Sequence, residues 1–129
     1  MAKLLVVDDE DDVRLVTGTV LKRAGHEVIE AASGEECLKV LESRKPDMII
    51  LDVMMPGMDG WEVCEKIKTS TAFRDIPVIM FTVKTDRWDM KHSRGTGADA
   101  HVSKSFGMGV LLKTVERLLE SGTPVESFE

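Results

Sequence analysis

The chain has 129 residues, enough for one domain with a single buried core. Its formal net charge is -6, which argues against non-specific binding to nucleic acid or anionic membrane surfaces. It contains no apolar run of about 18 residues, the length that a membrane-spanning helix needs, and Met1-Ala2-Lys3 leads directly into a short strand rather than a signal peptide. We therefore expect a globular protein of the cytoplasm.

Five short segments have the sequence pattern of strands. Residues 3–7, 48–51 and 76–81 are nearly continuous apolar runs, typical of strands buried on both faces of a parallel sheet. Residues 26–31 alternate polar and apolar side chains, which predicts a more exposed strand. Residues 99–103 form the last and shortest of the five.

Helical patterns alternate with these strands. The first helix begins before Val13 and ends at Ala24-Gly25, and Ser33 and Asp59 are placed to cap the second and third. A weaker helix is predicted at 86–94 and a clearly amphipathic one at 110–119. Alternating strands and helices predict an α/β fold with a parallel sheet covered on both faces.

Two further features describe the domain as a whole. Residues 1–120 are expected to form one domain, and residues 121–129, which lack periodicity, a mobile tail or a linker stub. Cys37 and Cys64 lie within helical patterns without metal-ligand spacing, which indicates buried free thiols.

Polar side chains with the potential for chemistry follow four of the predicted strands. They are Asp8 and Asp9 after the first, Asp52 after the third, Thr82 after the fourth and Lys104 after the fifth. Parallel strands place all their carboxyl ends at one edge of the sheet, where ligands of open α/β sheets bind. We therefore expect these five side chains to converge.

This set of residues suits phosphoryl transfer. Three neighbouring carboxylates repel one another, and a hard divalent cation such as Mg²⁺ or Mn²⁺ relieves that repulsion. A lysine and a hydroxyl group can bind phosphoryl oxygens, since catalysis of this transfer consists mostly of positioning and charge neutralisation. Asp52 would be the nucleophile and would form an acyl phosphate.

The motifs that carry these residues resemble those of the receiver domains of two-component response regulators. They are Val6-Val7-Asp8-Asp9-Glu10, Leu51-Asp52-Val53-Met54-Met55-Pro56-Gly57-Met58-Asp59-Gly60, Phe81-Thr82 and Gly97-Ala98-Asp99-Ala100-His101-Val102-Ser103-Lys104. The resemblance covers roughly residues 3 to 120. It implies a flavodoxin-like, doubly wound five-stranded parallel sheet of order 2-1-3-4-5 with five helices.

The resemblance also implies roles for single residues. Asp52 would accept a phosphoryl group from a histidine kinase or a phosphotransfer protein. Asp9, Asp52 and the main-chain carbonyl of Met54 would bind the metal ion directly, and Asp8 would act through water. Thr82 and Lys104 would hold the phosphoryl group. Such a protein promotes its own phosphorylation and dephosphorylation and is not a turnover enzyme on other substrates.

The resemblance also implies that signalling passes through the surface formed by the last two helices and the fifth strand. In this family, that surface contacts the partner. The target would be a downstream protein or an output domain absent from this sequence, and we expect no direct contact with nucleic acid or membrane. The chain could work alone or be a receiver excised from a longer protein.

The chain departs from the family pattern at Val83, His101 and Ser105, and Met54 lies where the family tunes the lifetime of the phosphate. Val83 replaces a small residue and could narrow access to Asp52. Ser105 replaces a proline with a cis peptide, and because a cis bond to a non-proline residue costs about 3–4 kcal/mol, we predict a trans Lys104–Ser105 bond. An apolar Met54 is poorly suited to orient an attacking water, which predicts slow self-dephosphorylation.

Other functions fit less well. A phosphatase of the haloacid-dehalogenase type needs a second aspartate two residues after the first, where this chain has Met54. A dinucleotide-binding domain needs a glycine-rich turn after the first strand, where this chain has Asp8-Asp9-Glu10. The remaining alternative is a receiver-like module that binds partners without being phosphorylated.

His101 stands where the family has a tyrosine or phenylalanine that moves with the threonine on activation. It is either an exposed residue of the fifth strand or a switch whose charge changes near pH 6.5. We predict that the switch interpretation holds and that output varies between pH 6 and 8. The test is partner binding by wild type and His101→Phe at both pH values, and unchanged binding would refute it.

Overall fold

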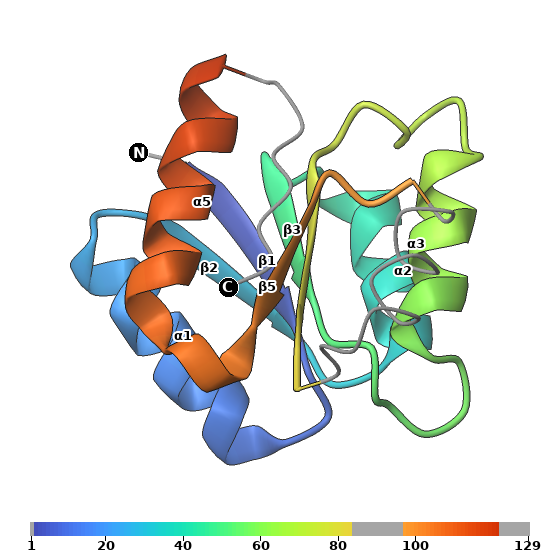
Figure 1. Cartoon of the computed structure of the whole chain (residues 1–129). Coiled ribbons are helices and arrows are strands. Elements are labelled where there is room, and N and C mark those ends of the chain that lie inside the picture. The colour runs from blue at the N-terminus through green and yellow to red at the C-terminus, as the bar shows by residue number, and fades with distance from the viewer. Residues whose placement is uncertain (1, 84–96, 122–129) are drawn as a thin grey trace.

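The structure, a computed structural model, describes residues 2–83 and 97–121. Its centre is a five-stranded parallel sheet of order β2-β1-β3-β4-β5, as predicted (Figure 1). The strands are β1 (Lys3–Val7), β2 (Glu27–Ala31), β3 (Met48–Leu51), β4 (Val78–Thr82) and β5 (Ala100–Ser103).

Four of the five predicted helices are present in the described residues. They are α1 (Asp11–Arg23), α2 (Gly34–Ser43), α3 (Gly60–Lys68) and α5 (Met108–Ser121), with a 3-10 turn η1 (Lys104–Phe106) before α5. The helix predicted at 86–94 lies outside the described residues, as does the tail 122–129. The last helix is longer than the predicted 110–119, so Ser121 belongs to α5 and not to the tail.

Both predicted helix caps are confirmed. Ser33 Oγ accepts a hydrogen bond of 3.1 Å from the Glu36 N–H at the start of α2. Asp59 Oδ1 accepts one of 2.9 Å from the Glu62 N–H at the start of α3. Each cap satisfies a backbone N–H that has no partner within its helix.

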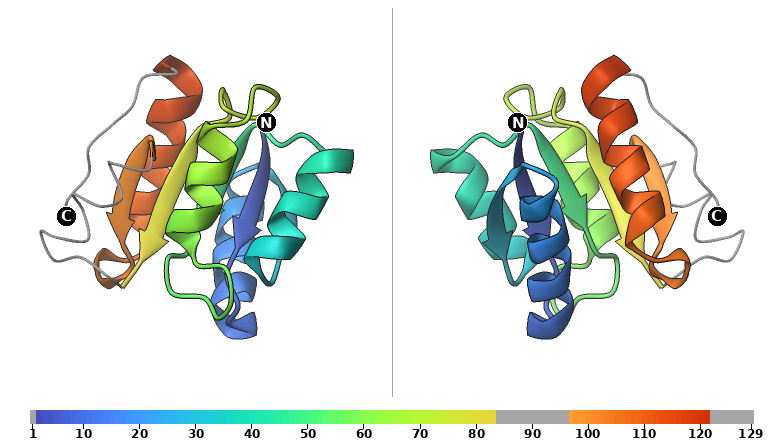
Figure 2. Two further views of the ribbon diagram at one scale, coloured as in Figure 1. Left: turned by 90° about the vertical axis from the view of Figure 1, so that its right-hand side faces the viewer. Right: turned by 90° about the vertical axis from the view of Figure 1, so that its left-hand side faces the viewer.

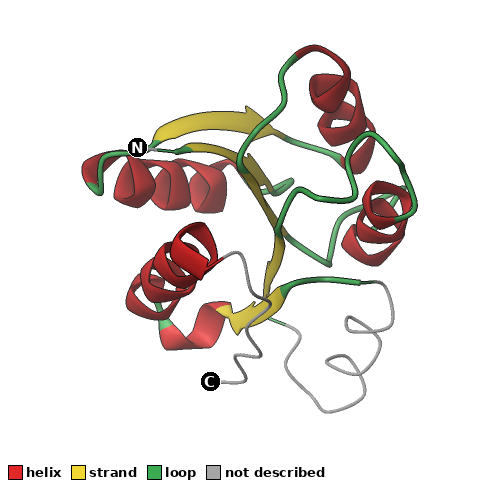
Figure 3. Cartoon of the chain, turned by 90° about the horizontal axis from the view of Figure 1, so that it is seen from above, coloured by secondary structure: helices red, strands yellow, loops and turns green. Residues whose placement is uncertain are grey.

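The helices cover the sheet in two layers (Figures 2 and 3). One face packs against α2 and α3 through a core that includes Cys37, Leu41 and Ile67. The other face packs against α1 and α5 and includes Leu21 and Leu111. Because neighbouring residues of a strand point to opposite faces, the continuously apolar strands supply both cores at once.

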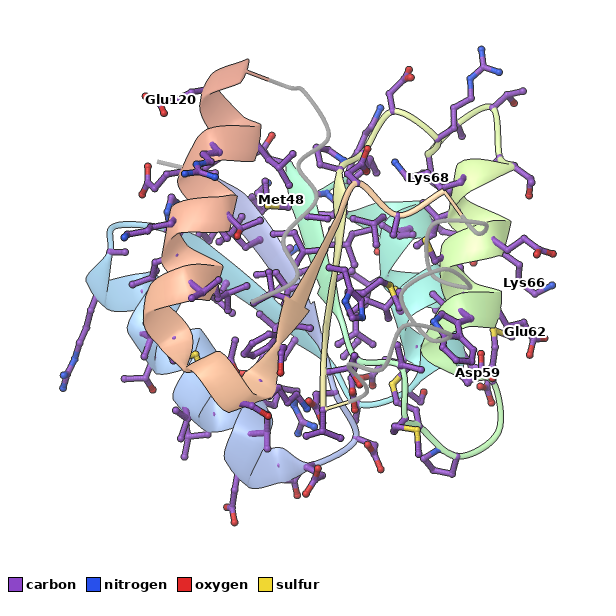
Figure 4. The ribbon with its side chains drawn as sticks, viewed as in Figure 1. Met48, Asp59, Glu62, Lys66, Lys68 and Glu120 are labelled. Carbon is purple, nitrogen blue, oxygen red and sulfur yellow. The ribbon has the colours of Figure 1, made fainter. Side chains whose placement is uncertain are left out.

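Side-chain positions agree with this layering. Met48 is fully buried beneath α5, whereas Glu62 and Lys66 project outward from α3 (Figure 4). Cys37 and Cys64 are buried free thiols, as predicted. Burial raises the pKa of the Cys37 thiol to about 12, so its reactive thiolate is suppressed. Among the described residues, no helix has the length and apolar content needed to cross a membrane.

The start of α3 lies directly against the end of β3. The Gly60 N–H donates a 2.9 Å hydrogen bond to the Val53 carbonyl. A Cβ atom at position 60 would lie 2.1 Å from the Asp52 carbonyl oxygen, well inside van der Waals contact. This position therefore requires glycine, and the close approach fixes the backbone of Asp52.

We predict that Gly60→Ala lowers the free energy of unfolding by more than about 2 kcal/mol, because backbone atoms must separate to admit the methyl group. Denaturant unfolding measures the change. Gly109→Ala is the control, since a Cβ atom there meets no heavy atom within 4 Å, and its stability should be unchanged or slightly raised. Equal stability of both variants would contradict the prediction.

Candidate functional site

Three carboxylates meet at the carboxyl edge of the sheet. Asp8 and Asp9 follow β1, and Asp52 follows β3, the strand paired beside it with Val7 opposite Leu51. One oxygen from each carboxylate lies within 4.8 Å of the other two. Asp8 and Asp52 are buried, and Asp9 is more exposed. The predicted convergence of these residues is therefore present.

Lys104 brings a positive charge to this cluster from the end of β5, the outermost strand, at the same edge of the sheet. It follows β5, and its Nζ lies 2.7 Å from Asp8 Oδ2 and 3.6 Å from Asp52 Oδ1. The ammonium group also lies 5.9 Å from the centre of the Phe81 ring, within the range of a cation–π contact. The side chain is 14% exposed, so solvent screens these interactions only weakly.

The environment of Asp52 opposes its ionisation. Desolvation raises the pKa of its carboxyl group to about 6, and the negative charge of Asp8 acts in the same direction. Lys104 acts against this shift, as do hydrogen bonds to the carboxylate from the Met54 N–H and the Thr82 side chain. Asp52 is therefore a carboxylate at neutral pH, in a site that favours the arrival of positive charge.

The chemistry of these donors fits a hard divalent cation. Three carboxylates supply oxygen ligands, which Mg²⁺ and Mn²⁺ prefer to the nitrogen and sulfur ligands of softer metals. In the part of the chain that the structure describes, Lys104 is the cation that contacts this cluster, and one positive charge beside three carboxylates leaves excess negative charge. A cation at this position would reduce both the repulsion and the cost of burying Asp52.

The other predicted residues lie around this cluster. Thr82 is fully buried at the end of β4, opposite Ser103 of β5. The Met54 side chain is 52% exposed, and its main chain contacts Asp52 through the N–H, a contact that the sequence did not indicate. Val83 is 62% exposed.

His101 is only 4% exposed, so the interpretation of it as an exposed strand residue is wrong. It lies opposite Met80 in the β4–β5 pairing, and by strand alternation its side chain is on the face opposite those of Ala100 and Val102. A single polar residue in a four-residue strand does not reveal its burial. Its role as a switch stays a prediction.

The segment after β5 follows the predicted backbone geometry. No peptide bond among the described residues is cis, so the Lys104–Ser105 bond is trans, as expected. The Ser105 N–H donates to Ser103 Oγ at 3.1 Å as the chain enters η1. This turn carries Lys104 back over the sheet edge toward Asp8.

Sequence reasoning missed Arg14. Its Nη1 donates a 2.7 Å hydrogen bond to the main-chain carbonyl of Asp8, directly behind the carboxylate cluster. An arginine in the first turns of an amphipathic helix normally faces solvent, and nothing in its spacing predicts a main-chain partner six residues earlier.

Comparison with known proteins agrees with this geometry. The sequence model of the response regulator receiver domain family matches residues 4–116 of this chain. The protein PilG of Pseudomonas aeruginosa is 35% identical over 125 residues, which cover 97% of this chain and 93% of PilG. The transcriptional regulatory protein AfsQ1 of Streptomyces coelicolor is 39% identical over 95% of this chain but only 53% of its own length. The chain thus spans about half of AfsQ1 and nearly all of PilG.

Solved structures give the same result. The chemotaxis response regulator CheY4 of Vibrio cholerae has a TM-score of 0.85 at 35% identity, covering 92% of this chain and 98% of CheY4. The response regulator TrrA of Thermotoga maritima, solved in complex with Mg²⁺ and BeF, has a TM-score of 0.82 at 36% identity, covering 92% of this chain and 99% of TrrA. The chain belongs to the response regulator receiver domain family, whose role is phosphorylation-dependent signalling.

Proposed function

We propose that Asp52 is the phosphoacceptor of this receiver and takes its phosphoryl group from a histidine kinase or a phosphotransfer protein. The observation that carries the proposal is the meeting of Asp8, Asp9 and Asp52 with Lys104 at one sheet edge. Asp52 combines burial with an anionic state at neutral pH, and so can act as a nucleophile without a separate base.

In the proposed reaction, an Asp52 carboxylate oxygen forms a bond to phosphorus while the bond from phosphorus to the partner's histidine nitrogen breaks. The electron pair of the broken bond remains on that nitrogen. The product is an acyl phosphate on Asp52, and no proton has to leave the carboxylate first. Backbone contacts at Gly60 and Val53 keep the attacking residue in place during this exchange.

A divalent cation, when bound, would neutralise negative charge on the carboxylates and the phosphoryl oxygens. Asp9, Asp52 and the Met54 main-chain carbonyl are the proposed ligands, with Asp8 acting through water. Lys104 already lies between Asp8 and Asp52, and we propose that it turns to a phosphoryl oxygen on Asp52. The Thr82 hydroxyl donates a hydrogen bond to the unphosphorylated Asp52 carboxylate. After phosphorylation, it would donate to a phosphoryl oxygen instead.

We further propose that phosphorylation of Asp52 alters the surface around β5 and α5 and so controls a partner protein or an attached output domain. The added charge, about two negative units, acts on Lys104 and Thr82, which lie at the ends of β5 and β4. Residues 1–120 are proposed as the receiver unit. Self-promoted phosphorylation and dephosphorylation, without turnover of other substrates, would be its chemistry.

The proposal predicts that a small phosphodonor adds one phosphoryl group to the wild-type chain only when Mg²⁺ is present. Asp52→Asn should gain none, because its amide is not a nucleophile. Asp75→Asn, at an exposed aspartate, should react like wild type. Intact mass after incubation measures the gain. No gain by wild type under any condition would refute the proposal and favour a module that works without phosphorylation.

The raised pKa of Asp52 predicts a pH-dependent stability in metal-free protein. The pKa of this carboxyl group is 3.8 in the unfolded chain and about 6 in the folded one, so the folded state binds the proton more tightly. The contribution of the Asp52 proton to the free energy of unfolding is complete below about pH 4 and is lost as the pH rises through about 6. Asp52→Asn cannot ionise and should therefore gain stability relative to wild type, by at most about 3 kcal/mol.

Denaturant unfolding in the presence of a chelator measures this difference. The advantage of Asp52→Asn over wild type should grow between about pH 4 and pH 6 and then level off. An advantage that stays constant across this range would contradict the assigned pKa.

A further inference from the structure

Arg14 makes three short contacts that join three segments of the chain. Its Nη1 donates to the Asp8 carbonyl at 2.7 Å, its Nε to Glu30 Oε1 at 3.0 Å and its Nη2 to Asp11 Oδ1 at 2.6 Å. The side chain is only 15% exposed, although it starts from α1 near the molecular surface. One planar guanidinium therefore links the β1–α1 loop, the first turn of α1 and strand β2.

The contact with the Asp8 carbonyl completes a full set of bonds around that residue. The Asp8 N–H donates to the Ala31 carbonyl at 3.2 Å. Asp8 Oδ1 accepts from the Glu10 N–H at 2.9 Å, and Oδ2 contacts Lys104 at 2.7 Å. The carbonyl is the remaining polar group, and Arg14 binds it. Because Asp9 follows Asp8 in the chain, these hydrogen bonds also restrict the position of the Asp9 main chain, from which the Asp9 carboxylate extends.

Neighbouring carboxylates neutralise the positive charge of Arg14. Glu30 and Asp11 both contact the guanidinium, and the hydrogen bond that Arg14 donates to Asp11 is the largest effect that raises the pKa of Arg14. Two carboxylates around one cation leave little positive charge to act on the cluster beyond them. The value of Arg14 to the site therefore lies in the position that it gives to the Asp8 main chain.

We propose that Arg14 is a positioning residue for the metal-binding carboxylates, acting through the Asp8 carbonyl. The inference rests on the proposed function, since it concerns the same cluster. Residues that hold metal ligands in place typically change metal affinity by 10–100-fold when replaced. A main-chain anchor should act at the lower end of that range.

Two explanations of Arg14 predict opposite changes in Mg²⁺ binding. If Arg14 acted only by its charge, Arg14→Gln would leave the site more negative and bind Mg²⁺ more tightly. If it positions Asp8, Arg14→Gln should bind about tenfold more weakly despite the lost positive charge. Arg14→Lys keeps the charge but not the rigid fork of donors, and should also bind about tenfold more weakly.

The experiment is calorimetric titration of the full chain with Mg²⁺, at a temperature where every variant is folded. Arg44→Gln is the matched control. Arg44 also joins a helix end to β2, with Nη2 3.2 Å from Glu27 Oε2, but both side chains are about half exposed. Its Mg²⁺ affinity should equal that of wild type. Should Arg14→Gln not fold, Arg14→Lys decides the question.

A second measurement needs no metal. In amide NMR spectra of metal-free protein, Arg14→Lys should shift or broaden the signals of Asp9 and Glu10 and leave that of Leu111 in α5 unchanged. Weaker Mg²⁺ binding by both variants, with this local change, supports the inference. If the wild-type chain binds Mg²⁺ and the Arg14 variants bind it equally tightly or more tightly, the role of Arg14 is overturned and the proposed metal site is not. No Mg²⁺ binding by wild type would overturn the proposed metal site and this inference together.

Discussion

Mutual repulsion among Asp8, Asp9 and Asp52 is the constraint on which the site depends. The fold brings their oxygens within 4.8 Å and removes two of the three residues from solvent. Such an arrangement is costly unless positive charge compensates it, and Lys104 supplies part of that compensation through contacts with Asp8 and Asp52. The remaining negative charge favours a cation at this edge, and the proposed phosphoryl transfer to Asp52 depends on that cation. In the proposed function, the stability lost at this edge is what keeps Asp52 available as a nucleophile.

The topology explains why these groups meet although Lys104 lies 96 positions after Asp8 in the sequence. Strands β1 and β3 are neighbours in the centre of the sheet, so their carboxyl ends bring the acidic residues side by side. Strand β5 ends at the same edge, and η1 directs Lys104 inward. The two helix layers bury the strands on both faces and leave this edge as the place where polar side chains collect.

Much of this could be predicted because apolar runs that end in charged residues identify both the buried strands and the sheet edge where polar side chains collect. Asp52 and Lys104 were recognisable for that reason, and so were the helix caps at Ser33 and Asp59. The burial of His101 and the anchoring by Arg14 could not be predicted, since both depend on partners from other elements of the fold. The length of α5 was underestimated because Gly109 interrupts the apolar pattern after Met108, and the polar Glu120 and Ser121 follow the last apolar residues.

The central claim is that Asp8, Asp9 and Asp52 act as one cation-binding group. NMR titration of the metal-free chain with Mg²⁺, observed at the side-chain carboxyl carbons of the aspartates, tests it most directly. The account predicts saturable shifts largest at these three residues, whereas Asp11 and Asp12 on the exposed start of α1 change little. Shifts that do not saturate, or that are equally large at Asp11 and Asp12, would show general attraction of cations to an acidic surface and contradict the account.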